Sequence, residues 1–412
     1  MKILLVGSGG REHALARGLS TNTNELHAAP GNPGIETLAT CHDVKVTDNE
    51  GLVALAQNLL VDLVVIGPEA PLVHGLADRL RAEKIAVFGP SQAAAQLEGS
   101  KDFAKQVMKE AGVATARSFT CTTESEIDAA LDTFGAPFVV KDDGLAAGKG
   151  VVVTRDREAA RTHALACKRV VIEEFLDGPE ISLFGICDGK TVLAMQPAQD
   201  FKRAYDGDEG PNTGGMGAYS PLPWAPINIV EEVRTTVLQP MVDAMALRGT
   251  PFIGLLYAGL AMTKNGIRVI EFNARFGDPE TQVLIPRLQT PLAELLYNAA
   301  TGNLATTELN WSNEVAVTVV IAADGYPATP KSGDEIKNLS EGDGVTIYHA
   351  GTKKVDGILL SGGGRVLTVT GIGRDLADAR ARAYEKVSQI ELAGSFYRKD
   401  IALAASLSQG GK

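Results

Sequence analysis

The sequence has few cysteines and few aromatic residues, and it has no excess of positive charge. Its four cysteines, Cys41, Cys121, Cys167 and Cys187, form no C-x-x-C pair, so neither a zinc site nor a disulfide framework is indicated and a reducing cytoplasm fits best. The net charge of −11 argues against a broad basic surface for nucleic acid or anionic lipid. No apolar run approaches ~18 residues, and the first one stops after Val6, so we expect neither a membrane span nor a signal peptide.

What the chain does have is length and glycine. Its 412 residues exceed one ordinary domain core, so about two to four domains are expected. Many of its 44 glycines stand in short clusters between apolar runs, which favours functional turns over flexible linkers. Residues 1–100 alternate apolar strands with helical stretches, a pattern typical of a parallel α/β sheet. Such sheets bind ligands at the strand ends, which here carry the turns 7–11, 30–32 and 67–69.

The pattern of strands and helices changes after residue 100. Residues 101–324 predict a small α+β lid near 120–187, followed by a larger sheet. The Gly/Pro/Lys/Ser stretch at 325–333 marks a further boundary, after which strands and one helix follow. We therefore expect three domains, at 1–100, 101–324 and 325–412.

The first glycine-rich turn, GSGGRE at 7–12, differs from a dinucleotide-binding loop. Glu12 stands where G-x-G-x-x-G requires its third glycine, and PGN at 30–32 follows in place of a ribose-binding acid. A nicotinamide role is therefore weakly supported. A helix N-terminus beside Arg11 still suits phosphate or another anion, and a tight turn without a ligand is an equal alternative.

The second glycine-rich segment, KDDGLAAGKG at 141–150, is not a Walker A loop. Three residues rather than four separate the relevant glycines, and glycine follows Lys149 in place of Ser or Thr. The flanking apolar runs predict a strand–loop–strand hairpin. Such a hairpin can lie over nucleotide phosphates with Lys141 as a fixed cation, although a plain glycine hairpin with solvated lysines explains the segment better when it is taken alone.

The acidic segment 271–278 places oxygen ligands on one face of a predicted strand. Residues i and i+2 of a strand point to the same side, so Glu271 and Asn273 present their oxygens together, and such ligands suit Mg²⁺ that carries ATP phosphates. Arg275 follows on that side and is placed to stabilise charge on an acyl phosphate. A polar strand edge facing water is the less favoured alternative, because four polar or charged side chains fall within eight residues.

Two further segments give weaker signals. The strand that ends in EEFL at 173–176 can hold an adenine at a hinge, or it is simply a strand end. The loop at 200–219 has few apolar anchors, and loops of this length are usually functional or disordered. Lys202, Arg203 and the 213–217 backbone are placed to hold an anionic substrate, with a mobile surface loop as the alternative.

Together, these segments resemble the phosphoribosylamine–glycine ligase family of the ATP-grasp superfamily. One GKG is weak evidence, whereas ten stretches in the family's order that span almost the whole chain are strong evidence. The matching stretches are GSGGREHALA (7–16), GPEAPLV (67–73), FGPS (88–91), QLEGSKDFAK (96–105), DGLAAGKGVVV (143–153), VVIEEFLDG (170–178), GPNTGGMGAYSP (210–221), LYAGL (256–260), EFNARFGDPETQ (271–282) and HAGTK (349–353).

The resemblance implies an α/β protein with an N-terminal parallel α/β substrate domain, an ATP-grasp fold with an α+β lid, and a small C-terminal domain. It implies an ATP-dependent carbon–nitrogen ligase of purine biosynthesis that joins glycine to 5-phosphoribosylamine through glycyl phosphate, giving glycinamide ribonucleotide, ADP and phosphate. Positioning and charge neutralisation carry most of such a phosphoryl step. ATP and Mg²⁺ or Mn²⁺ are the implied co-substrate and metal. We expect a monomer that acts on small molecules, with no nucleic-acid or membrane partner.

The family pattern assigns roles to individual residues. The catalytic residues implied are Arg275 and Asp278, and the metal ligands are Glu271 and Asn273. The implied nucleotide contacts are Lys105, Lys141, Gly144, Ala147, Gly148, Lys149, Gly150, Glu173, Glu174, Phe175, Leu176 and Glu180. The implied substrate contacts are Gly9, Gly10, Arg11, Pro30, Gly31, Asn32, Gly67, Pro68, Glu69, Lys202, Arg203, Gly214, Gly215, Met216 and Gly217.

The chain departs from the family pattern in three places. Asp142 stands where the family usually has Ala, Phe201 replaces a usual His, and the segment 155–169 is shorter than usual. If Asp142 faces the site, ATP affinity is expected to fall. The alternatives are another ATP-grasp ligase or carboxylase with a different acceptor, a nucleotide-binding regulatory module without turnover and, least favoured, a dehydrogenase.

Overall fold

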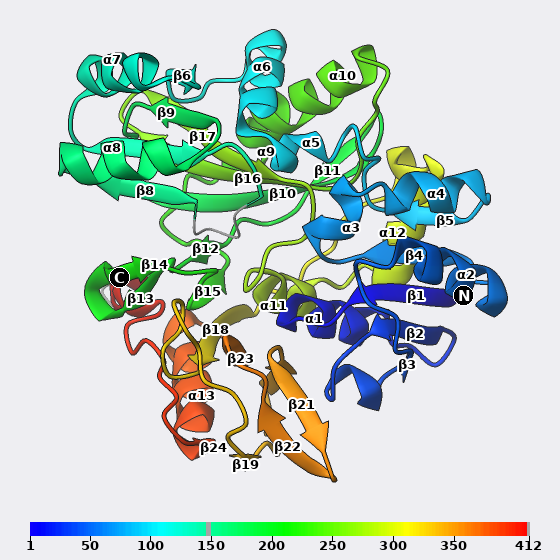
Figure 1. Ribbon diagram of the computed structural model, residues 1–412. Coiled ribbons are helices and arrows are strands. Elements are labelled where there is room, and N and C mark those ends of the chain that lie inside the picture. Colours follow the sequence, from blue (N-terminus) through cyan, green and yellow to red (C-terminus); the bar gives the residue numbers. More distant parts are fainter. Residues whose placement is uncertain (146–149, 410–412) are drawn as a thin grey trace.

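The N-terminal part of the chain is a five-stranded parallel sheet in the computed structural model, which describes residues 1–145 and 150–409 (Figure 1). The strand order is β3-β2-β1-β4-β5, and every neighbouring pair is parallel, so the predicted parallel α/β domain is confirmed. The strands are β1 (Lys2–Gly7), β2 (Glu25–Pro30), β3 (Thr40–Cys41), β4 (Leu63–Ile66) and β5 (Ala86–Phe88). The helices are α1 (Gly10–Leu19), α2 (Asn49–Leu59), α3 (Glu69–Val73) and α4 (Leu76–Ala82).

Within the predicted lid, residues 118–173 form a four-stranded antiparallel sheet of order β6-β9-β7-β8 that has its own small core. Lys141 and Glu173 lie on the adjacent strands β7 and β9. The following strand, β10, pairs with β16 of the central sheet, so the lid sheet ends at Glu173. The lid elements are β6 (Ser118–Cys121), α7 (Glu124–Phe134), β7 (Phe138–Asp142), β8 (Val151–Thr154), α8 (Arg157–Ala166) and β9 (Val170–Glu173).

The central sheet is antiparallel, with the order β11-β10-β16-β17. A bulge interrupts its last pair, because Gly259 lies opposite Glu271 while Leu260 lies opposite Val269, which leaves Ile270 as the extra residue. Bulges of this kind re-aim neighbouring groups. The elements are α5 (Gln96–Gly99), α6 (Lys101–Ala111), β10 (Glu180–Asp188), β11 (Val192–Ala194), α10 (Gln239–Leu247), β16 (Ile253–Thr263) and β17 (Gly266–Asn273).

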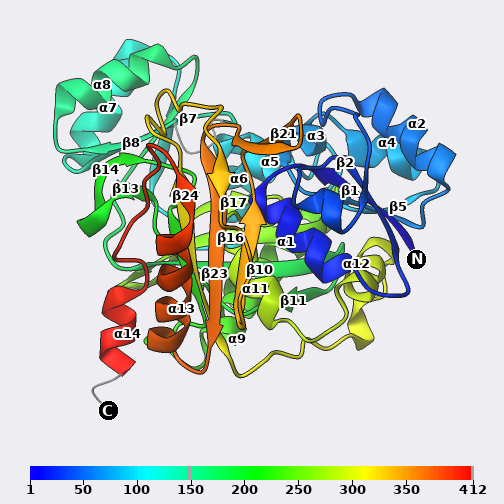
Figure 2. The same cartoon turned by 90° about the horizontal axis from the view of Figure 1, so that it is seen from below.

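The last large sheet joins the middle of the chain to its C-terminal part, in the order β12-β15-β18-β23-β20. Helix α13 (Leu376–Gln389) packs along β18 and β23 (Figure 2). The short helix α11 (Thr281–Leu284) contacts α1, β15 and β18, so residues 274–280, which precede it, lie where the N-terminal, central and last sheets meet. The strands are β12 (Gln199–Asp200), β15 (Gly217–Ser220), β18 (Val315–Ala322), β20 (Val345–His349) and β23 (Arg365–Gly373).

The remaining elements are short two-stranded pairs and helices. The pairs are β13 (Arg203–Tyr205) with β14 (Glu209–Asn212), β19 (Ile336–Lys337) with β24 (Glu391–Leu392), and β21 (Thr352–Val355) with β22 (Ile358–Ser361). The helices are α9 (Ile229–Val233), α12 (Leu292–Thr301) and α14 (Leu403–Gln409). Among the described helices, none has the length and apolar character needed to cross a membrane.

Candidate active site

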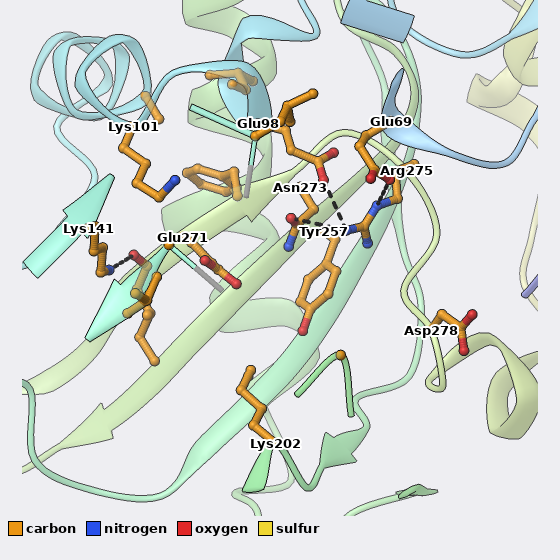
Figure 3. A pocket seen from close by; sticks show the side chains of 18 of the residues that line it. Glu69, Glu98, Lys101, Lys141, Lys202, Tyr257, Glu271, Asn273, Arg275 and Asp278 are labelled. Atoms are coloured by element: carbon orange, nitrogen blue, oxygen red, sulfur yellow. Dashed lines mark hydrogen bonds and ion pairs between the residues drawn. The ribbon is translucent and has the colours of Figure 1, made fainter. Parts of the chain in front are cut away.

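A cavity of about 340 Å³ is lined by residues from nearly the whole length of the chain, from Arg11 to Arg365. Figure 3 shows part of its wall, including Lys141, Glu271 and Arg275. Many of the residues predicted from the sequence come together there. Those that line the cavity are Arg11, Pro68, Glu69, Lys105, Lys141, Gly144, Gly150, Glu173, Lys202, Gly214, Glu271, Asn273, Arg275 and Asp278.

Other predicted site residues are not part of this cavity wall. From the nucleotide set these are Glu174, Phe175, Leu176 and Glu180, and from the substrate set Gly9, Gly10, Pro30, Gly31, Asn32, Gly67, Arg203, Gly215, Met216 and Gly217. Three more, Ala147, Gly148 and Lys149, lie outside the described residues.

Two of the predicted phosphate-binding lysines flank one buried glutamate. Glu173 is 3% exposed, and its carboxylate pairs with Lys141 through Oε1 and with Lys105 through Oε2, the latter at 2.7 Å. Burial alone would raise the pKa of Glu173, but the two ammonium groups outweigh it and the pKa is lowered. The side chain of Glu173 therefore supplies the counter-charge of the lysines, which are held in place before any anionic ligand binds.

Lys101 is a third lysine on the wall and is outside the set predicted from the sequence. Its ammonium donates a hydrogen bond of 3.0 Å to the carbonyl of Gly144, at the start of the glycine-rich loop. The pKa of Lys101 is lowered chiefly by burial, with Glu271 opposing this effect. A signal was available, because Lys101 and Lys105 are spaced i, i+4 in α6 and share one helix face.

The end of β17 carries the predicted metal platform. Glu271 and Asn273 are both on the cavity wall, and they alternate with the buried side chains of Phe272 and Ala274 as a strand requires. The bulged residue before them, Ile270, accepts a hydrogen bond of 3.0 Å from Lys141 through its carbonyl. This contact links the lid to the central sheet at the point where the two oxygen ligands begin.

The donor set at this platform fits a hard divalent cation. Within residues 1–145 and 150–409, the carboxylate of Glu271 makes no hydrogen bond or ion pair, and the amide oxygen of Asn273 accepts only a long one, 3.4 Å from Arg275. The same part of the chain has no group of three or more His, Cys, Asp or Glu able to hold a metal. Mg²⁺ commonly takes one or two protein oxygens and completes its shell with phosphate and water, so two ligands suffice.

Arg275 is held by two acids from the N-terminal half of the chain. Its Nη2 lies 2.9 Å from Glu98 Oε1, and its Nε lies 3.5 Å from Glu69 Oε2. Figure 3 shows the side chains of Glu69, Glu98 and Asn273 around this guanidinium. Burial disfavours the charged form of Arg275, but the neighbouring carboxylates, with Glu98 the strongest, raise its pKa. A fixed cation therefore stands beside the metal platform.

Asp278 is joined to both ends of the chain. The backbone N–H of Arg11 donates to its Oδ2 at 3.4 Å, and the guanidinium of Arg365 lies 3.4 Å from the same oxygen. Burial alone would raise the pKa of Asp278, but Arg365 and Arg11 lower it overall. Arg365 is outside the set predicted from the sequence, and no local motif marks it, because it stands in β23 far along the chain from its partners.

The turn after β1 is held by hydrogen bonds of side chains within and next to it. The Glu12 carboxylate is 2% exposed and accepts hydrogen bonds from the Gly9 N–H and the Arg11 Nε, both at 2.6 Å. Asn32 is also engaged internally, since its side-chain amide donates to the carbonyls of Ser8 and His349 at 2.8 and 2.9 Å. These contacts explain why most of this turn is absent from the cavity wall.

The comparison with known families decides the chain's membership. Residues 1–98, 99–281 and 316–404 match, in turn, the N domain, the ATP-grasp (A) domain and the C domain described for phosphoribosylglycinamide synthetase. The chain belongs to the phosphoribosylglycinamide synthetase family. The family and fold class predicted from the sequence motifs are thus confirmed.

Individual relatives of this family agree over the full length. The phosphoribosylamine–glycine ligase of Streptomyces coelicolor is 62% identical over 98% of this chain and 100% of that protein. The ligase of Mycobacterium tuberculosis is 52% identical over 98% of this chain and 99% of that protein. The crystal structure of the ligase from Thermotoga maritima has a TM-score of 0.85 at 32% identity, covering 98% of this chain and 100% of that one.

More distant structures share the fold. The biotin carboxylase domain of the 2-oxoglutarate carboxylase from Hydrogenobacter thermophilus has a TM-score of 0.74 at 17% identity, covering 96% of this chain and 91% of that one. At this identity the likeness extends to the arrangement of elements, and chemistry must be argued from the side chains on the cavity wall.

Proposed function

We propose that this chain joins glycine to 5-phosphoribosylamine with ATP, giving glycinamide ribonucleotide, ADP and phosphate. The observation that carries the proposal is the meeting of three groups in one cavity of a member of this family: the lysine cluster, the Glu271–Asn273 pair and Arg275. These are the groups needed to hold ATP phosphates, a divalent cation and a reacting carboxylate.

Lys105 and Lys141 bind the phosphates of ATP in this proposal, and Gly144 and Gly150 lie on the same cavity wall. Glu271 and Asn273 are the residues that would hold Mg²⁺ or Mn²⁺, which supplies neutralisation of phosphate charge when bound. The phosphoribosyl group is assigned to the part of the wall that carries two cationic side chains, Arg11 and Lys202, together with Pro68, Glu69 and Gly214.

The reaction has two steps. A carboxylate oxygen of glycine attacks the γ-phosphorus of ATP, the bond from that phosphorus to ADP breaks, and glycyl phosphate forms. The ribosylamine nitrogen then attacks the glycyl carbonyl carbon, phosphate leaves, and the nitrogen loses a proton. Arg275 stabilises negative charge on the acyl phosphate, and the carboxylate of Asp278 lies beside the reacting groups. We further assign the protein to the cytoplasm, which its four free cysteines support.

The test is the release of ADP and phosphate from ATP when glycine and ribosylamine 5-phosphate are supplied together. We expect release to require both substrates and a divalent cation, and glycinamide ribonucleotide to accumulate in equal amount. Bicarbonate in place of glycine serves as the control for a carboxylase. The proposal fails if ADP release does not depend on glycine, or if bicarbonate replaces glycine.

A further inference from the structure

Seven carboxylates line the cavity, and most of them already have a cationic partner. Five pair with lysine or arginine side chains within 4 Å. Within the described part of the chain, the other two, Glu271 and Glu280, make no such pair. Glu271 belongs to the metal platform, which leaves Glu280 as the acid without an assigned role.

Hydroxyl groups rather than cations hold Glu280. Its Oε1 accepts hydrogen bonds from the Tyr257 hydroxyl at 2.8 Å and from the Ser182 hydroxyl at 3.4 Å, while its Oε2 takes part in neither bond. Tyr257 and Ser182 are themselves 2.8 Å apart, so two strands of the central sheet fix the orientation of the carboxylate. Glu280 itself is only 3% exposed.

Among the described residues, Lys202 makes no ion pair with Glu280, although its charge opposes the rise in the pKa of that acid. Lys202, on the same cavity wall, lies 3.2 Å from Asp200 and 3.2 Å from Glu180, and so serves those two acids. Burial, reinforced by the charge of Asp200, raises the pKa of Glu280 to about 6. A buried carboxylate without an ion-pair partner is stabilised in its ionised form when a positively charged ligand binds beside it.

The amino-acid substrate of the proposed reaction brings such a charge. Glycine carries an ammonium group one carbon away from the carboxylate that reacts, so the acceptor of this ammonium must share a pocket with the metal platform and Arg275. Glu280 meets that requirement, because it lines the same cavity and is among the carboxylates whose charge acts on Arg275. The ribosylamine nitrogen, in contrast, must be neutral to attack, and a neutral amine binds a carboxylate less strongly than an ammonium group does.

We propose that Glu280 binds the ammonium group of glycine, with Tyr257 and Ser182 as the residues that position its carboxylate. This inference rests on the proposed function. An ammonium group donates up to three hydrogen bonds, and one accepted by an ionised carboxylate is stronger than a neutral one. Glu280 would thus select an amino acid over a simple carboxylic acid of similar size.

The test is the variant Glu280→Gln, which keeps the size of the side chain and removes its charge. We expect the KM for glycine to rise about 10- to 100-fold, while the KM values for ATP and ribosylamine 5-phosphate change less than about threefold. Glu294→Gln, on the exposed surface of α12, is the matched control and should leave all three unchanged. Tyr257→Phe, which keeps the charge and removes one positioning hydroxyl, should raise the KM for glycine by a smaller factor.

A second measurement uses the wild-type protein and does not depend on the folding of a variant. Acetate and glycolate lack the ammonium group. As competitors of glycine, each should have an inhibition constant at least about 10-fold higher than the KM for glycine. The inference is overturned if Glu280→Gln leaves the KM for glycine unchanged, if it raises all three KM values alike, or if acetate competes as well as glycine binds. Absence of glycine-dependent ADP release by the wild-type protein would instead remove the proposed function itself.

Discussion

The guanidinium of Arg365 contacts both the main-chain carbonyl and the side-chain carboxylate of Asp278. Its Nη1 donates a hydrogen bond of 2.6 Å to the Asp278 carbonyl, and its Nη2 lies 3.4 Å from Oδ2. The same Nη1 donates to the carbonyl of Gly214 at 2.7 Å. One guanidinium from β23 therefore fastens the loop before β15 to the segment after β17, and the C-terminal part of the chain completes the cavity.

Replacement of Arg365 by Ala should lower kcat/KM about 30- to 100-fold, because three acceptors lose one fixed donor. Arg365→Lys should recover only part of this, since an ammonium cannot span the same acceptors. The matched control is Arg374→Ala, whose side chain is 86% exposed. Steady-state kinetics of the three variants check the prediction. Equal activity of the Arg365 and Arg374 variants would contradict the positioning role.

Glu271→Gln should remove turnover by at least about 100-fold without loss of stability. The charge of one proposed metal ligand disappears, whereas no hydrogen bond or ion pair among the described residues is broken. Raised Mg²⁺ or Mn²⁺ concentrations should restore part of the activity, because they increase the metal occupancy of a site whose affinity has been lowered. Activity and thermal unfolding are measured over a series of metal concentrations. Near-normal turnover at low metal would show that Glu271 is not a ligand.

Glu173→Gln should destabilise the protein by about 3–5 kcal/mol, since two buried ammonium groups lose their counter-charge. ATP should recover part of the loss by supplying negative charge to the same lysines. The adjacent variant Glu174→Gln is the control, because Glu174 pairs with Arg117, which is 73% exposed, and such pairs contribute about 0–1 kcal/mol. Thermal unfolding with and without ATP distinguishes the two variants.

The contribution of Glu173 should also depend on pH in a fixed direction. Its pKa in the folded protein is lowered below the ordinary value of 4.5, so its stabilisation is fully present above that pH and is lost as the pH falls through the folded pKa. The difference in unfolding temperature between the wild type and Glu173→Gln should therefore be constant near neutral pH and shrink below 4.5. A difference that grows on acidification would refute the assignment.

Asp142→Ala should change the KM for ATP by less than about threefold. Asp142 adjoins Lys141 in β7, so their side chains point to opposite faces, and Asp142 is not on the cavity wall. Its side chain lies beside Cys167. Burial is the main cause that raises the pKa of that thiol, and the charge and a hydrogen bond of Asp142 raise it further. Lys141→Ala, the comparison variant, should raise the KM at least about 10-fold. Equal effects would mean that Asp142 faces the nucleotide.

Periodicity and motif order were enough to predict the parallel N-terminal sheet and the family. The alternation of a strand also placed Glu271 and Asn273 on one face, as the structure has them. The contacts between distant segments were not predictable in the same way. Arg365 reaches Asp278 only because β18 pairs with both β15 and β23. Glu173 meets Lys141 through the pairing of β9 with β7, and it meets Lys105 only because the lid folds onto α6. No local pattern encodes such pairings.

A glycine in a turn can make room for a protein side chain as well as for a ligand. Gly67, predicted as a substrate contact, lies directly over Glu12. A methyl group added at Gly67 would lie 2.7 Å from Glu12 Cδ and would also press on its Oε1. Glu12 cannot move away at low cost, since it is buried and holds Gly9 and Arg11 through hydrogen bonds of 2.6 Å.

Gly67→Ala should therefore destabilise the protein by about 1–3 kcal/mol, the range for overpacking a filled interior, with a fall in Tm of about 2–4 °C for each kcal/mol. Gly342→Ala is the matched control, because its backbone is not left-handed and a methyl group there meets no described atom within 4 Å. Alanine at that position should leave Tm unchanged or slightly raised, through a smaller loss of chain entropy on folding. Thermal unfolding of both variants measures the effect. If Gly67→Ala were as stable as Gly342→Ala but bound ribosylamine 5-phosphate more weakly, Gly67 would be a ligand contact after all.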